Sequence, residues 1–128
     1  MAAPAPVEAR VQQGEWYAVS VSFVYFFCVL AQTGHRDPAE AQRAYLAGMQ
    51  RILPRDHLPY LAREHGPLAL DAVWAPLDQL DPLAKQALVE AATATIAHDG
   101  RMHVAEAELL RTLCGVLHCP LPPLPAGA

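Results

Sequence analysis

The stretch Ala97-His98-Asp99-Gly100-Arg101-Met102-His103-Val104-Ala105-Glu106 decides the fold, because it separates two helical patterns. Before it, small and apolar residues recur at steps of three and four, as on one face of a helix: Ala84, Ala87, Leu88, Ala91, Ala92, Thr95 and Ile96. After it, the same step returns in Val104, Ala107, Leu110, Cys114 and Leu117, widened by Leu109, Leu113 and Val116. Gly100 accepts the positive φ that commonly ends a helix. The stretch therefore predicts a corner where one helix turns back onto the next.

The acidic residues of this stretch fit helix capping. If His103 is the N-cap, Glu106 stands at the position from which a carboxylate reaches back to the cap amide. Glu106 and Glu108 also place negative charge in a first helical turn, where the helix dipole favours it. The first interpretation of Asp99, Gly100 and Glu106 is therefore a helix-helix corner.

The same residues also suggest a second interpretation, a metal site. Asp-Gly-x-apolar-x-x-x-Glu is the second half of a calcium-loop pattern, with Asp99 near its middle and Glu106 at its end. Thr95 and Ala97 occupy the positions of two further oxygen ligands, which argues against an EF-hand. The remaining hypothesis is a divalent cation site, for calcium or magnesium, formed by Asp99, Glu106 and Glu108. The sequence requires no other cofactor.

The Asp-Gly turn followed by an acidic helix resembles the signature turn of the TerB-like (tellurite-resistance) helical domains. Three segments besides the turn resemble the C-terminal region of bacterial membrane-bound M48-type zinc peptidases: Leu80-Asp81-Pro82-Leu83-Ala84-Lys85, Glu106-Ala107-Glu108-Leu109-Leu110-Arg111 and Cys119-Pro120-Leu121-Pro122-Pro123-Leu124. The resemblance is good over about residues 77–124 and only suggestive over about residues 19–53. It implies a TerB-like all-α module whose partner is a peptidase domain or membrane complex. It also implies a place on the cytoplasmic side of a membrane, through a parent protein.

The sequence lacks the catalytic motifs of the peptidases that it resembles. An M48 peptidase carries His-Glu-x-x-His, yet none of the six histidines here is followed by glutamate. No glycine-rich phosphate loop or marked nucleophile occurs either. We therefore predict that the chain is not an enzyme. We expect it to be a non-catalytic accessory, regulatory or interaction module. One alternative is a divalent-cation-binding stress-response protein of the tellurite-resistance type that uses the Asp-Gly turn. The other is a membrane-associated or oligomerisation module.

Residues 16–34 are the basis of that last alternative, because they contain no charged residue. Their length is close to the roughly 20 residues of a membrane-spanning helix. Trp16 and Tyr17 at one end would suit a membrane interface. Ser20, Ser22 and Gln32 favour instead a central helix that is apolar nearly all round because the other helices surround it. Both interpretations stay open at the level of sequence.

The composition of the chain limits which kinds of partner it is expected to bind and in which redox compartment it is expected to lie. The chain has 128 residues, a formal net charge of −4 and only nine Lys and Arg, which form no basic run. Nucleic acid is therefore a poor partner. The odd number of cysteines, three, argues against a disulfide framework and for a reducing compartment.

The whole chain reads as one all-α domain, a single compact bundle of about five helices. We expect disorder over residues 1–9, a domain over residues 10–124 and a disordered tail over residues 125–128. Asp37-Pro38 and Asp81-Pro82 each have the pattern of an N-cap followed by a first helical proline. Helices are expected over about residues 7–33, 38–53, 68–80, 82–97 and 104–118.

Overall fold

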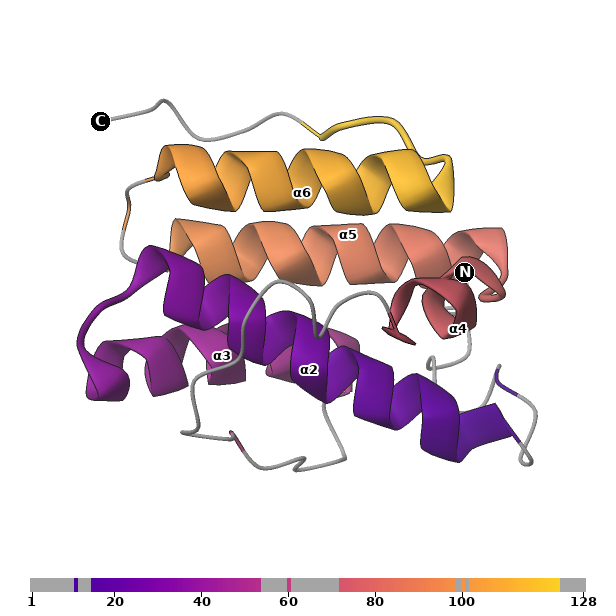
Figure 1. The fold of residues 1–128 in the computed structure, drawn as a ribbon, viewed down its shortest axis with the longest axis horizontal. Coiled ribbons are helices and arrows are strands. Elements are labelled where there is room, and N and C mark those ends of the chain that lie inside the picture. The colour runs from indigo at the N-terminus through magenta and orange to yellow at the C-terminus, as the bar shows by residue number, and fades with distance from the viewer. Residues whose placement is uncertain are drawn as a thin grey trace, which may run out of the picture.

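The computed structural model describes residues 11, 15–53, 60, 72–98, 100 and 102–122 (Figure 1). Five α-helices occur in these ranges: α2 (Trp16–Gly34), α3 (Pro38–Ile52), α4 (Trp74–Asp78), α5 (Pro82–Ala97) and α6 (Val104–Leu117). No strand occurs in this part of the chain. The structure thus confirms the predicted all-α bundle. The predicted disordered segments, residues 1–9 and 125–128, lie outside the described residues.

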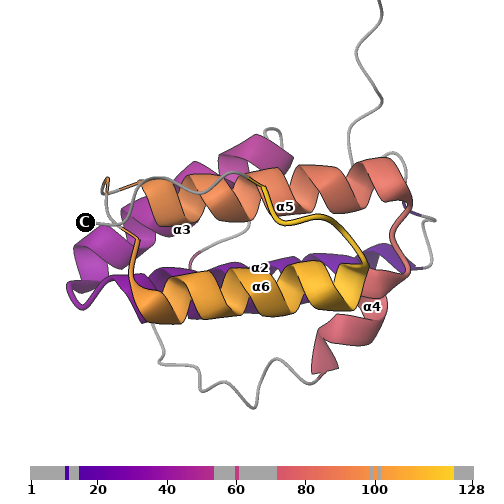
Figure 2. The ribbon, with the colours of Figure 1, turned by 90° about the horizontal axis from the view of Figure 1, so that it is seen from above.

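The helices form two layers. Figure 2 shows α3 beside α5 in one layer and α2 beside α6 in the other, with α4 at one end. α5 and α6 are antiparallel and are joined by the predicted corner (Figure 1). α2 contacts each of the other four helices, so it is the central element of the bundle.

The position of α2 explains its apolar sequence. Val19, Phe23, Phe26, Phe27 and five further residues of this helix are buried. The ring of Phe26 packs edge-on against that of Trp74 of α4, with centroids 6.0 Å apart. Length and composition alone would allow α2 to cross a membrane, and half of its most apolar window is buried inside the bundle. The sequence left open whether this segment is a central helix or a membrane-contacting one. In this structure α2 is a central helix that the other helices contact.

α3 and α5 approach each other closely because small residues face each other between them. A Cβ atom on Gly48 of α3 would lie 1.9 Å from Oγ1 of Thr95 and 3.0 Å from the carbonyl oxygen of Ala91, both on α5. A side chain at position 48 would require the Thr95 side chain or one of the two helices to move. The buried face of α3 consists of Tyr45, Met49 and neighbouring small and apolar residues.

The starts of α3, α5 and α6 agree with the sequence, whereas α2 begins at Trp16 rather than near residue 7 and α4 begins at Trp74 rather than near residue 68. The Asp81 carboxylate accepts a hydrogen bond from the Ala84 backbone N–H at 2.8 Å, so Asp81 is the N-cap of α5 as predicted. Pro38 is the first residue of α3, but the Asp37 side chain makes no cap hydrogen bond. One prediction for α6 is wrong: Val104, placed on the buried stripe, is 80% exposed, because it lies on the side of the helix opposite the face that Glu106, Leu110 and Leu117 bury.

Candidate functional site

The corner between α5 and α6 is built as its local sequence predicts. Gly100 has a φ of 74°, in the left-handed region that favours glycine. The backbone N–H of His103 donates to Oε1 of Glu106 at 3.0 Å, which is the carboxylate half of the predicted capping box. Asp99, the central residue of the metal hypothesis, lies outside the described residues.

Glu106 also has a role that the sequence did not reveal. Its side chain is fully buried and lies against the last residue of α2, Gly34. A Cβ atom on Gly34 would lie 2.2 Å from both Cδ and Oε2 of Glu106. Gly34 therefore does more than end α2, because its missing side chain makes room for the carboxylate. Glu106 ties the start of α6 to the end of α2.

Glu108 points away from Glu106. Its side chain is 65% exposed and lies 3.6 Å from the Arg111 guanidinium, one turn further along α6. Residues two apart on a helix do not share a face. Among the residues that the structure describes, no three His, Cys, Asp or Glu side chains are grouped to hold a metal. The structure therefore does not bring Glu106 and Glu108 together, and the divalent cation site stays a prediction.

Two histidines meet beside this corner, which sequence reasoning missed. His35 follows α2, is buried, and has Nδ1 2.9 Å from the carbonyl oxygen of Ala31. Its ring centroid lies 6.1 Å from that of His98 at the end of α5. Nε2 of His98 is in turn 3.8 Å from Oε2 of Glu40 on α3. These contacts join elements far apart in the sequence, so no local pattern could have indicated them.

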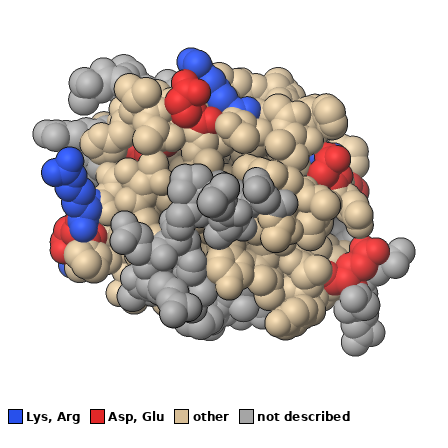
Figure 3. Space-filling view, viewed as in Figure 1, with Lys and Arg blue, Asp and Glu red and all other residues tan. Residues whose placement is uncertain are grey.

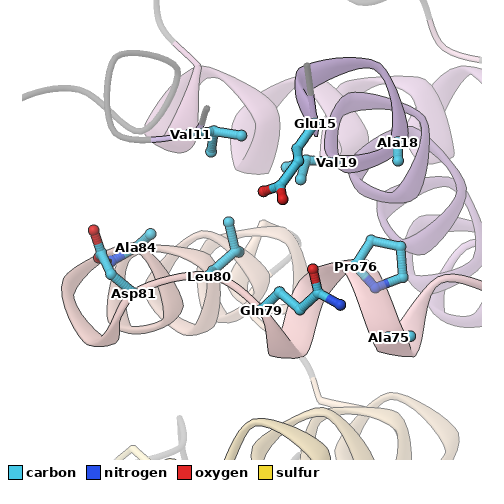
Figure 4. A pocket seen from close by; sticks show the side chains of 10 residues that line it. All are labelled: Val11, Glu15, Ala18, Val19, Ala75, Pro76, Gln79, Leu80, Asp81 and Ala84. Atoms are coloured by element: carbon cyan, nitrogen blue, oxygen red, sulfur yellow. The ribbon is translucent and has the colours of Figure 1, made fainter. Parts of the chain in front are cut away.

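The opposite end of the bundle is hollowed. A pocket of about 430 Å³, which we call the acidic hollow, lies between the start of α2 and the turn from α4 to α5. Its wall is formed by Val11, Glu15, Ala18, Val19, Ala75, Pro76, Gln79, Leu80, Asp81 and Ala84. Figure 4 shows the Glu15 carboxylate and the Gln79 side-chain amide pointing into the space between the two segments.

A second hollow lies next to the first and shares Ala18 and Pro76 with it. This apolar hollow has a volume of about 480 Å³ and is lined by Tyr17, Ala18, Val21, Ser22, Tyr25, Ala72, Val73 and Pro76. Tyr17 stands at its edge and is 80% exposed. We call the two hollows together the α2–α4 face.

The charged side chains that line the α2–α4 face are all acidic among the described residues. Glu15 and Asp81 contribute two carboxylates, and neither Lys nor Arg occurs among the described residues that line it. On the side seen in Figure 3, the charged side chains that are described form a few small separate groups. Asp78, on α4 outside both hollows, accepts a hydrogen bond from Lys85 at 2.9 Å, which holds the pKa of that carboxyl below its usual value.

A third hollow, of about 740 Å³, lies between α5 and the chain that follows α6. Val89, Leu117, Cys119 and Leu121 contribute to its apolar wall. The neighbouring Cys114 is buried, and this burial raises the pKa of its thiol. Cys114 therefore packs as a core residue, as buried structural cysteines do.

Comparison with known protein families, with curated proteins and with solved structures found no match to this chain. The resemblance to TerB-like domains and to the C-terminal region of M48-type peptidases therefore stays a prediction from the sequence.

Proposed function

We propose that this chain is a non-catalytic helical module that binds a partner protein through its α2–α4 face. The observation that carries the proposal is Tyr17, an aromatic side chain that is 80% exposed beside two adjoining hollows. Exposed tyrosine next to concave apolar surface is a common anchor of protein interfaces, where tyrosine, tryptophan and arginine dominate the binding energy. Scattered single apolar residues elsewhere on the surface need no such explanation.

The sequence supports the same role. A module that resembles the part appended to M48-type zinc peptidases is expected to act on a neighbouring domain rather than to carry its own reaction. Under this proposal the partner is a peptidase domain or a membrane complex, as the resemblance implies. The buried acid of the opposite end, Glu106, then has an architectural role.

Site-specific cross-linking in cells tests the proposal. A photo-crosslinking amino acid is placed at position 18 or 75, on the exposed Ala18 and Ala75 of the α2–α4 face. The matched control is position 50, the exposed Gln50 of α3. We expect the same partner to cross-link at positions 18 and 75 and not at position 50. Equal cross-linking at all three positions, or at position 50 alone, would contradict the proposal.

The captured partner is then purified and its affinity measured with Tyr17→Ala. Loss of an interface anchor weakens binding by about tenfold or more. Leu83→Ala is the control, because Leu83 is 53% exposed and lies on α5, outside both hollows. If the two variants weaken binding equally, the α2–α4 face is not the docking site.

A further inference from the structure

We propose that the acidic hollow receives a lysine or arginine side chain that the partner presents on an apolar segment. This inference rests on the proposed docking function of the α2–α4 face. It adds to that function the chemistry of the residue that anchors the partner.

The shape of the acidic hollow suits a long side chain with a polar end. Its volume of about 430 Å³ lies within the range of about 300–1,000 Å³ that is usual for ligand pockets. Val19 and Ala84 are buried at its base, and Leu80 is only 7% exposed. Their side chains offer apolar contact for the methylene stem of a lysine or arginine, which packs along apolar surface while its charged end stays in water.

The polar groups of the acidic hollow select a cation. The Glu15 carboxylate points into the space from α2, and the Gln79 side-chain amide does so from the α4–α5 turn (Figure 4). The second carboxylate of the wall, Asp81, caps α5 through the Ala84 N–H, so the positive end of that helix offsets part of its charge. Glu15 is also an N-cap residue, of α2, but its side chain makes no cap hydrogen bond, so its carboxylate is the more available of the two and the principal attractor. An acidic segment would meet two carboxylates without a compensating Lys or Arg among the described lining residues.

The adjoining apolar hollow explains why the basic residue would come with apolar neighbours. Tyr17, Val21 and Val73 line it, and it begins where the acidic hollow ends, at Ala18 and Pro76. Apolar contact there supplies the non-directional part of the affinity. The ion pair with the exposed Glu15 contributes less to affinity and more to orientation and to the choice of partner.

Three short peptides with the same leucine-containing sequence test the inference. They differ only at the central position, which is lysine, norleucine or glutamate. Binding to the full chain is followed by the NMR signals of Val19, Leu80 and Ala84 at low and at physiological salt. We expect the lysine peptide to bind more tightly than the norleucine peptide, by about threefold as for an exposed ion pair, and the glutamate peptide most weakly. Added salt should reduce the preference for lysine.

Glu15→Gln identifies the carboxylate responsible. This variant should abolish the preference for lysine over norleucine while leaving the affinity for the norleucine peptide unchanged. Glu90→Gln is the control, since it removes the same charge from an exposed residue of α5 that lines neither hollow of the α2–α4 face. It should keep the preference.

The outcomes that overturn the inference differ from those that overturn the docking function. If lysine and norleucine peptides bind equally to the original chain, or if the preference survives Glu15→Gln, the basic anchor is wrong and the docking face stands. Signals that move with protein concentration alone would show that a second copy fills the hollow, which also overturns the inference. If no peptide moves these signals at millimolar concentration, the hollow is not an anchor site. Cross-linking at positions 18 and 75 then decides the docking function separately.

Discussion

The two ends of the bundle hold their carboxylates in opposite ways. At the α5–α6 corner, Glu106 is fully buried, accepts the His103 N–H and packs against Gly34. At the other end, Glu15 is exposed and points into a hollow that nearby apolar side chains line (Figure 4). An acidic residue in a conspicuous motif can thus be architectural, while one that belongs to no motif can line a hollow at the surface.

Glu106→Ala should destabilise the fold by about 2–3 kcal/mol, because it removes a cap and leaves a cavity between α2 and α6. Glu108→Ala is the matched control, since Glu108 is exposed and should change the stability by no more than about 0.5 kcal/mol. Chemical denaturation of both variants measures the difference. Equal losses of stability would mean that Glu106 does not hold the corner together.

Gly34→Ala should cost about 1–3 kcal/mol of unfolding free energy, because the added methyl group would overlap the Glu106 carboxylate. Gly115→Ala, on the exposed side of α6, has open space around the new methyl group. That variant should instead gain about 0.5–1 kcal/mol, as alanine restricts the unfolded chain and favours a helix. Thermal melts compare the two. A neutral Gly34→Ala would show that the ends of α2 and α6 adapt to one another.

Asp78→Asn should have a small effect that depends on pH. The hydrogen bond from Lys85 lowers the pKa of Asp78 below its usual 3.8, so its stabilising contribution is present above that value. It fades as the pH falls through the lower pKa of the folded state. The melting temperatures of the original chain and the variant should therefore differ slightly near neutral pH and converge in acid. A difference that grows in acid would contradict the assignment.

Local patterns in the sequence account for the features that the structure confirms. Gly100, the capping contact from Glu106 to His103, and the Asp81 cap each depend on residues within four positions of one another. Helical periodicity likewise identified the buried face of α5. Such features need no knowledge of how the helices pack.

The features that could not be predicted from the sequence depend on packing between segments that are far apart along the chain. Gly34 and Glu106 are 72 positions apart, and His35 and His98 are 63 positions apart, so their contacts follow only from the arrangement of the helices. The exposure of Val104 has the same origin, because the packing of α6 buries the face of Glu106, Leu110 and Leu117, and Val104 lies on the other side of the helix. Glu15 belongs to no motif and became a candidate only through the hollow beside it.

A thermal melt in EDTA, repeated with calcium or magnesium added, tests most directly whether the α5–α6 corner is architectural. A cation that binds only the folded state would raise the melting temperature by mass action. Because Glu106 is buried as a cap and Glu108 points to solvent, our account predicts no rise with either ion. A rise of several degrees with one ion that is lost in Asp99→Ala would contradict it. The Asp-Gly turn would then be a cation site, as the second interpretation of the sequence holds.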